Sequence, residues 1–311
     1  MARRFFCICA AFVVSLMGDA PCNASHTFVT SSSFQQHLKA LLQLESEHFK
    51  NHESTRKFAY LFGKQYDELF SPLQKPGDLP TLDGADVGLL YLAASMTQFY
   101  TFDARYVHDM QLDLAELQTR GEATQSQYDA MYNALVASRQ FSLARTFARM
   151  HHGPAMVRIP DFRDISNAGT TAPTAMVVSS DGRHLDRRSI NLRKRAQIVV
   201  IIAPFCHFAQ RGIRDIEADG TLRKTFRKNA AWLVPPNSAT SFEAMEEWDR
   251  KHPVHAMEMA YTFQEWRMFE RWQLPTFYFL KSGKVVAEVI GWPREGRKGE
   301  IRAALRRVGL L

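Results

Sequence analysis

The stretch that decides the fold reads Gln197-Ile-Val-Val-Ile-Ile-Ala-Pro-Phe-Cys-His-Phe-Ala-Gln-Arg-Gly-Ile-Arg-Asp-Ile216. It opens with a short, continuous apolar run, which is typical of a fully buried β-strand. After Cys206 and His207, the apolar residues Ala209, Ile213 and Ile216 are spaced for one face of a helix. The sequence therefore predicts a cysteine at a strand-to-helix junction. There, the free backbone N–H groups of the helix would stabilise a thiolate.

The chain before this stretch shows helical periodicity. Apolar residues recur at helical spacing in the segments 34–49, 55–69, 84–99, 103–117, 125–136 and 139–150. Proline and glycine separate several of these segments, and Gly121 stands where a helix C-cap is expected. No part of residues 34–150 alternates like a strand. We therefore expect an all-helical domain of antiparallel hairpins over residues 25–155.

Residues 156–174 contain prolines, a glycine and several polar residues, which predict a linker. Beyond this segment, strands are expected at 175–178, 183–185, 198–202, 230–234, 254–259, 274–280 and 285–290, the first two joined by an Asp181-Gly182 turn. Helices are expected after Cys206 and at 242–249, 263–272 and 300–308. Strands that alternate with helices and end in a hairpin and a helix indicate an α/β domain over residues 175–311. Its mixed sheet would be covered by helices on both faces.

The N-terminus has the pattern of a secretory signal. Arg3 and Arg4 precede an apolar region from Phe5 to Met17, and cleavage is expected after Ala24. The apolar run is short for a membrane span, so the mature chain is expected to have none. This predicts a periplasmic or secreted protein with a signal peptide at residues 1–24. The alternative is an N-terminal segment that is retained as an anchor.

Cleavage would change the cysteine count. The chain has four cysteines, and Cys7, Cys9 and Cys22 would leave with the signal. Cys206 would then be the one cysteine of the mature protein, so no intramolecular disulfide could form. A lone thiol in an oxidising compartment is either reactive or paired with another molecule.

Charge and histidine patterns point to no further class of function. The formal net charge is +7, which weakly favours anionic partners. The basic clusters lack a nucleic-acid-binding motif and interleaved aromatic residues, so no nucleic-acid partner is expected. The histidines lack the spacing of zinc ligands. No metal or organic cofactor is implied.

Three segments carry a family resemblance. Ala203-Pro-Phe-Cys206 stands at a strand end, Leu274-Pro275-Thr276 precedes a strand, and residues 277–291 read as a final hairpin with a closing glycine. In this order they resemble the thioredoxin-like superfamily. The nearest members are secreted thiol–disulfide exchange proteins with an extra N-terminal hairpin. The resemblance covers a little under half of the chain.

The resemblance implies roles for six residues. Cys206 would be the nucleophile and His207 would favour its thiolate, while Phe205, Leu274, Pro275 and Thr276 would line the substrate groove, with Pro275 in the cis form. The sequence also departs from the family. The dithiol motif Cys-x-x-Cys reads Cys206-His-Phe-Ala209, Phe205 replaces the usual tryptophan, and Val200 stands where a buried acid is often found.

Two functions remain open from the sequence. The first is single-cysteine (monothiol) thiol–disulfide exchange, or capture of a client protein as a mixed disulfide, with the helical domain positioning the thioredoxin-like domain on its client. The second is a redox-inactive scaffold of a cell-envelope complex. Conjugative pilus-assembly factors, with a helical front half and a degenerate thioredoxin-like rear half, offer a precedent for this architecture. In that case Cys206 would be a small buried hydrophobic residue.

Overall fold

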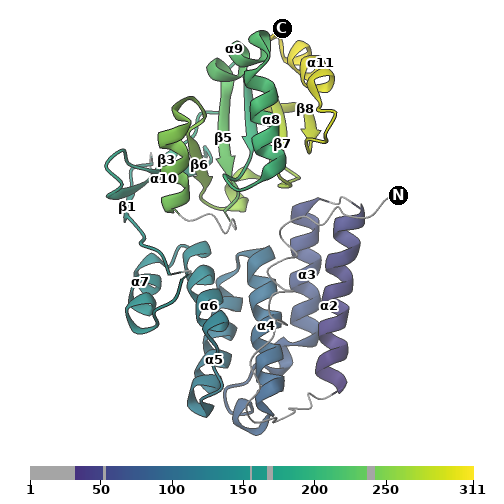
Figure 1. Cartoon of the computed structure of the whole chain (residues 1–311). Helices are drawn as coiled ribbons and strands as arrows, with labels where there is room; N and C mark the ends of the chain where they lie inside the picture. Colours follow the sequence, from purple (N-terminus) through teal and green to yellow (C-terminus); the bar gives the residue numbers. More distant parts are fainter. Residues whose placement is uncertain (1–31, 52–53, 155, 167–170, 237–241) are drawn as a thin grey trace.

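The protein folds into a helical part and a sheet-containing part, which stand one above the other (Figure 1). The computed structural model describes residues 32–51, 54–154, 156–166, 171–236 and 242–311. The expected signal peptide, with Cys7, Cys9 and Cys22, lies outside the described residues. Within the described ranges, no helix is long and apolar enough to cross a membrane.

The helical domain consists of hairpins that pack around α4. Its helices are α2 (Ser32–Asn51), α3 (Thr55–Leu69), α4 (Gly84–Thr101), α5 (Ala104–Arg120), α6 (Gln125–Ala137) and α7 (Phe141–Met150), with 3-10 turns at Ser71–Leu73 and Leu79–Thr81. Helix α4 contacts α2, α3, α5 and α6 and buries Val87, Leu90, Ala93 and Ala94. A helix buried on most sides needs apolar residues around most of its circumference, which explains the strongly apolar sequence of α4.

Local signals set the ends of these helices. Gly121 has a φ of +72° and closes α5, as expected from the sequence. Thr124 and Gln127 form a reciprocal capping box at the start of α6. Between α6 and α7, Arg139 has a φ of +64°, and Phe102 after α4 has a φ of +59°. Non-glycine residues seldom adopt this left-handed conformation.

The C-terminal domain is built on one mixed sheet with the strand order β1-β3-β2-β6-β5-β4-β7-β8. The strands are β1 (Asp161–Asp164), β2 (Thr174–Val178), β3 (His184–Ser189), β4 (Ala196–Ile201), β5 (Ala230–Val234), β6 (Met257–Ala260), β7 (Thr276–Lys281) and β8 (Lys284–Ile290). Strands β4, β5 and β6 run parallel to one another, and β7 is antiparallel to both β4 and β8. The predicted fold class, a helical domain followed by a mixed sheet flanked by helices, is confirmed.

Both faces of this sheet are covered. Val200 of β4 and Phe277 of β7 belong to the core formed with α8 (His207–Glu217), α9 (Gly220–Asn229) and α11 (Lys298–Val308). Val199 and Ile201 belong to a second core with Trp266, whose segment follows β6. Because side chains alternate across a strand, the continuous apolar run of β4 serves both faces.

The structure differs from the sequence-based expectation in four segments. Residues 161–164, expected within the linker, form β1, which pairs in parallel with β3. Helix α9 was not expected, because its sequence is mainly polar and charged and only two of its side chains, Leu222 and Phe226, are buried. The strand expected at 254–259 is a 3-10 turn (Pro253–His255) followed by the shorter β6. The segment expected to be a helix at 263–272 contains only a short 3-10 turn, η5 (Phe263–Trp266). The helix expected at 242–249 is present as α10 (Phe242–Lys251).

Candidate functional site

Cys206 occupies the N-cap position of α8, directly after the loop that leaves β4. Its backbone N–H donates to the carbonyl of Ala203 at 3.1 Å, and its carbonyl accepts from the N–H of Gln210 at 2.9 Å. The Gln210 side chain also donates to the carbonyl of Pro204 at 2.6 Å. These bonds fix the turn that brings the cysteine to the helix start, so the predicted strand–cysteine–helix junction is present.

The cysteine side chain faces the loop before β7. Cys206 is 6% exposed, and its Sγ lies 3.8 Å from the carbonyl oxygen of Leu274, toward which the thiol can donate. The Leu274–Pro275 peptide bond is cis, as the sequence predicted. The structure therefore brings Cys206, Leu274 and Pro275 together from positions almost seventy residues apart.

The other predicted site residues lie around this contact in different ways. Phe205 is 39% exposed beside the cysteine. His207, the first residue of α8, is also exposed, and no described residue forms a hydrogen bond or ion pair with its ring. Thr276 is fully buried, and its hydroxyl donates to the carbonyl of Gln273 at 2.7 Å. This hydrogen bond stabilises the loop that carries Pro275. Because the Thr276 side chain is buried, it could contact a substrate directly only if it became exposed.

The interior next to the site is apolar. Val200 is fully buried and pairs with Trp232 of β5 and Phe277 of β7. No carboxyl group therefore occupies this position on the central strand. Among the described residues, no group of three or more histidine, cysteine, aspartate or glutamate side chains could hold a metal ion.

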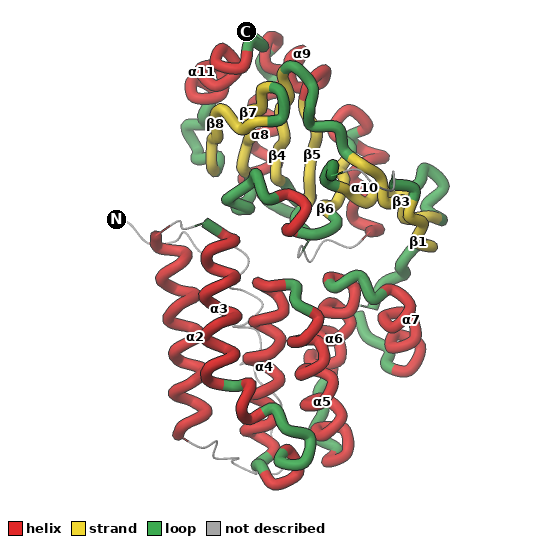
Figure 2. Tube along the Cα trace, turned by 180° about the vertical axis from the view of Figure 1, so that it is seen from behind, coloured by secondary structure: helices red, strands yellow, loops and turns green. Residues whose placement is uncertain are grey.

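The helical domain docks on the same edge of the sheet as Cys206. The Arg139 guanidinium donates to the carbonyl oxygens of Ala260 and Tyr261, both at 2.9 Å, and to that of Pro236 at 3.3 Å. Ala260 is the last residue of β6, and Tyr261 and Pro236 lie just beyond the C-terminal ends of β6 and β5. Seen from behind, the loops at this edge face the upper ends of the helices (Figure 2).

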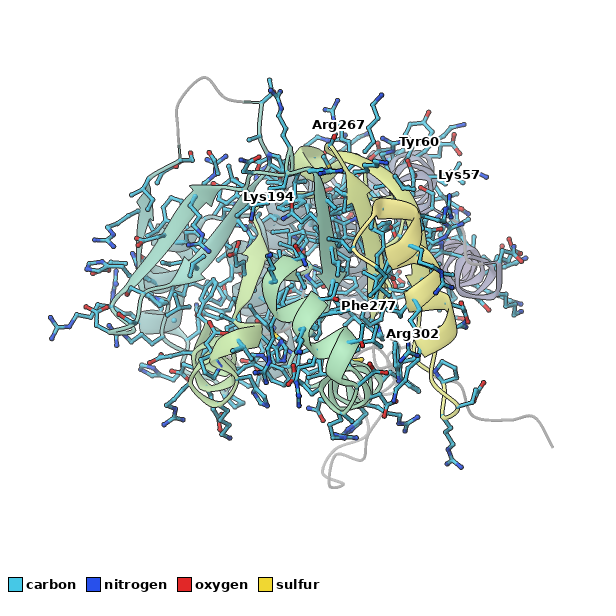
Figure 3. The ribbon with its side chains drawn as sticks, turned by 90° about the horizontal axis from the view of Figure 1, so that it is seen from above. Lys57, Tyr60, Lys194, Arg267, Phe277 and Arg302 are labelled. Carbon is cyan, nitrogen blue, oxygen red and sulfur yellow. The ribbon has the colours of Figure 1, made fainter. Side chains whose placement is uncertain are left out.

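A second set of docking contacts involves the segment that leads to Pro275. The N–H of Thr55 donates to the carbonyl of Glu270 at 2.8 Å. The Glu270 carboxylate accepts from Ser54 Oγ at 2.5 Å and from Arg56 at 2.8 Å. In agreement with these bonds, Arg267 lies on the same side of the molecule as Lys57 and Tyr60 of α3 (Figure 3).

Aromatic contacts complete the docking. The ring of Phe102 meets that of Phe263 edge-on, with centroids 4.8 Å apart, and Phe141 of α7 lies against Phe162 of β1 at 5.2 Å. The sequence offered no signal for these pairs or for Arg139 and Glu270. Each pair joins residues more than twenty positions apart, and neither the Arg139 turn nor Glu270 stands in a motif.

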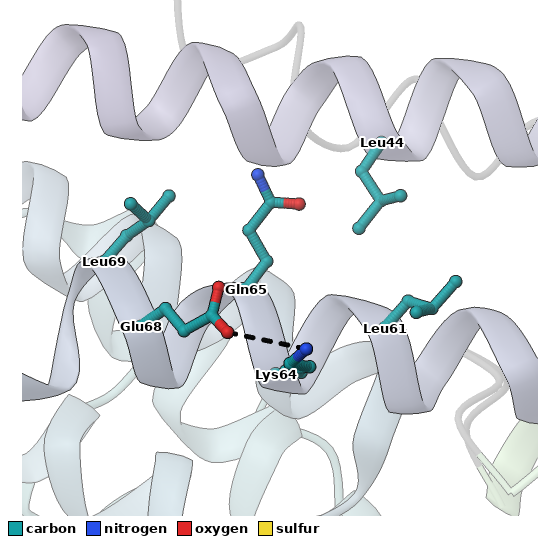
Figure 4. Close-up of a pocket in the computed structure, with 6 residues that line it drawn as sticks. All are labelled: Leu44, Leu61, Lys64, Gln65, Glu68 and Leu69. Atoms are coloured by element: carbon teal, nitrogen blue, oxygen red, sulfur yellow. Dashed lines mark ion pairs between the residues drawn. The ribbon is translucent and has the colours of Figure 1, made fainter.

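A surface depression of about 360 Å³ lies elsewhere, between α2 and α3 (Figure 4). Leu44, Leu61 and Leu69 line it, together with an ion pair of 3.6 Å between Lys64 and Glu68. None of the residues predicted for the site lines this depression, so it is separate from the Cys206 site.

Comparisons with known proteins give structural neighbours at low identity. No protein-family model matches the chain, and no curated protein matches it. A thiol:disulfide interchange protein of the thioredoxin family from Chlorobium tepidum TLS is similar over 44% of this chain and 95% of its own, with 17% identity and a TM-score of 0.32. A proposed thioredoxin from Neisseria meningitidis is similar over 44% of this chain and 90% of its own, with 17% identity and a TM-score of 0.31.

The topology itself assigns the fold. Parallel strands β5 and β4 are followed across the sheet by antiparallel β7 and β8. Cys206 stands at the N-cap of the helix after β4, and a cis proline precedes β7. The C-terminal part of the chain, from Thr174 onward, is therefore a thioredoxin-like domain.

Proposed function

We propose that this protein performs thiol–disulfide exchange with Cys206 as its single reactive sulfur. The observation that carries the proposal is the position of Cys206 at the N-cap of α8, with its Sγ 3.8 Å from the carbonyl of Leu274, next to Pro275. The helix N-terminus stabilises an anionic sulfur. The neighbouring loop supplies a backbone carbonyl against which a substrate segment could align once the Cys206 thiol is deprotonated.

The reaction needs one thiolate and two external partners. The Cys206 thiolate attacks one sulfur of a substrate disulfide, a new sulfur–sulfur bond forms, and the other substrate sulfur leaves as a thiolate. A second thiolate, from the substrate or from a small thiol, then attacks the mixed disulfide and releases Cys206. One disulfide is exchanged for another, so no net oxidation occurs. This suits isomerisation, removal of small-thiol adducts, or capture of a client.

Export of the protein is part of the proposal. Its support is the N-terminal pattern of basic and apolar residues before Ala24. In an oxidising compartment, disulfides are available as substrates. Edman sequencing of the protein recovered from the periplasm of an expressing bacterium should begin at Ser25, whereas an intact Met1 in the membrane fraction would indicate a retained anchor.

A redox-inactive scaffold is the second candidate, and two observations favour it. Cys206 is 6% exposed, and the residue three positions after it is Ala209, so no resolving thiol stands in the usual place. In this case the domain would bind an envelope partner without chemistry at Cys206.

Alkylation of Cys206 across a pH series separates the two candidates. For thiol exchange, we expect the folded protein to react with an apparent pKa below the value of about 8.5 for a free cysteine. It should also gain one glutathionyl group from glutathione disulfide, and Cys206→Ser should gain none. A thiol that reacts only after urea unfolding would exclude the exchange function and leave the scaffold.

A further inference from the structure

The helical domain attaches to the thioredoxin-like domain on both sides of Cys206. Strand β4, which leads to Cys206, lies between β5 and β7 in the sheet. Arg139 binds carbonyls at or just beyond the C-terminal ends of β5 and β6, on one side of β4. Residues 54–56 bind Glu270 in the segment that enters β7, on the other side. The sheet edge that carries the cysteine is thus the docked edge.

The first attachment starts from the turn between α6 and α7. Arg139 has a φ of +64° and closes α6, because its N–H donates to the carbonyl of Val136 at 3.0 Å and the N–H of Gln140 donates to that of Leu135 at 2.9 Å. Its guanidinium donates to carbonyls of Ala260, Tyr261 and Pro236, and also caps its own helix at Val136. The turn that carries Arg139 is thus fixed within the helical domain, and from it the Arg139 side chain binds the other domain.

The second attachment is polar and closely fitted. Glu270 accepts three hydrogen bonds, one at its backbone carbonyl and two at its carboxylate. The N–H of Trp272 also donates to Thr55 Oγ1 at 3.3 Å. Two residues further on, Leu274 faces the Cys206 sulfur. The helical domain is therefore bonded to the segment that carries one side of the candidate site.

We propose that the helical domain acts as a size filter, which limits the size of the molecules that can reach Cys206. It lets a disulfide on a narrow carrier reach the sulfur and keeps out a disulfide on the surface of a folded domain. A narrow carrier is either a small-molecule disulfide or an extended peptide that bears one. This inference rests on the proposed thiol exchange, because it concerns which disulfides reach the sulfur. Arg139 and Glu270 serve as positioning residues, since they hold the two domains together and do not touch the sulfur.

The test compares two maleimides with the same reactive group. N-ethylmaleimide is small, and a maleimide coupled to a surface lysine of a small folded protein is bulky. We expect the folded wild-type protein to react much more slowly with the bulky reagent. In Arg139→Ala, the bulky-to-small rate ratio should rise about tenfold, the size expected when a hydrogen-bonded partner at a buried contact is lost. In Glu270→Ala the rise should be smaller, about twofold to fivefold, because the Glu270 side chain is 43% exposed.

Two matched control variants separate size filtering from a general loss of stability. Arg227→Ala deletes an arginine of α9 that forms a two-bonded pair with Glu217 of α8, and α9 lies at the end of the thioredoxin-like domain far from the helical domain (Figure 1). Thr124→Ala weakens the cap of α6 without touching the other domain. Both controls should keep the wild-type rate ratio. Glutathione disulfide and a short peptide disulfide, used in separate arms, should form mixed disulfides with the wild type at comparable rates.

The possible failures are distinguishable. If N-ethylmaleimide labels the folded protein but Arg139→Ala and Glu270→Ala keep the wild-type ratio, the size filter is overturned and thiol exchange stands. The size filter is also overturned if the bulky-to-small rate ratio of the folded wild type is close to that of the urea-unfolded chain. The same holds if this ratio rises equally in the control variants. If neither reagent labels any folded variant, the proposed function fails, and the size filter fails with it.

Discussion

Replacing Asp113 by asparagine should remove a large pH dependence from the stability of the helical domain. Asp113 lies on α5 and is fully buried. Its Oδ2 accepts from Gln74 Nε2 at 2.9 Å, and its Oδ1 has no hydrogen-bond partner among the described residues. Burial raises the pKa of the Asp113 carboxyl to about 8, opposed by the hydrogen bond from Gln74 and assisted by the nearby Asp109 carboxylate.

The sign follows from proton binding. An aspartate in the unfolded chain has a pKa of 3.8, so between about pH 4 and pH 8 the folded protein keeps a proton that the unfolded chain releases. The free energy of unfolding is therefore highest below this window and falls by about 1.4 kcal/mol per pH unit as the pH rises through it. Over the two units from pH 5 to pH 7, this amounts to about 3 kcal/mol.

The asparagine side chain of the Asp113→Asn variant would keep a carbonyl oxygen for Gln74 and could not ionise, so its contribution should not change with pH. Urea unfolding, followed by far-UV circular dichroism at several pH values, measures this slope. All five tryptophans lie beyond residue 231, so tryptophan fluorescence follows the thioredoxin-like domain as an internal reference. Asp78→Asn removes an exposed carboxylate from the same domain and should keep the wild-type slope. If Asp113→Asn also kept it, the carboxyl would be ionised in the folded protein and the reasoning would be wrong.

Three further substitutions test packing and capping. Gly212→Ala would place a Cβ 3.2 Å from the Trp292 ring and should lower the stability of the thioredoxin-like domain by about 1–3 kcal/mol; an unchanged urea midpoint by tryptophan fluorescence would contradict this. Trp292→Phe removes a 2.7 Å hydrogen bond to Asp215 and should cost about 1–3 kcal/mol; the control for the loss of one buried fluorophore is Trp232→Phe, because Trp232 Nε1 has no hydrogen-bond partner among the described residues. Thr124→Ala breaks the capping box of α6 and should cost about 1 kcal/mol, measured by circular dichroism, while the neighbouring Ser126→Ala should cost less.

The parts of the fold that could be predicted depend on local signals. Helix α3 and strand β5 have the predicted bounds, because polar caps or prolines flank a clear periodicity. The contact between Cys206 and the Leu274–Pro275 loop followed from the order of three segments in one family. Local pattern and family order agree in these places, and the structure brings the two segments together; the roles of these residues stay a prediction.

The parts that could not be predicted depend on tertiary contacts. Residues 263–272 have apolar residues at helical spacing, but Trp266, Phe269 and Trp272 point into the second core and the chain is helical only over η5. Strand β1 has one half-buried residue, Phe162, and it forms because β3 offers a free edge. Arg139 has no sequence signal, because its partners are backbone carbonyls.

The balance of effects on Cys206 suggests that access matters more than the acidity of its thiol. The N-terminus of α8 favours the thiolate by about 0.3–1 kcal/mol. The contact of Sγ with the Leu274 carbonyl, at 3.8 Å, favours the protonated thiol, and so does burial of the sulfur. These effects are opposite in sign. A sulfur in a residue that is 6% exposed meets few partners in either protonation state. The contacts of Arg139 and Glu270, which determine how the helical domain sits over this edge, are therefore expected to influence the rate of exchange more than the identity of residue 207.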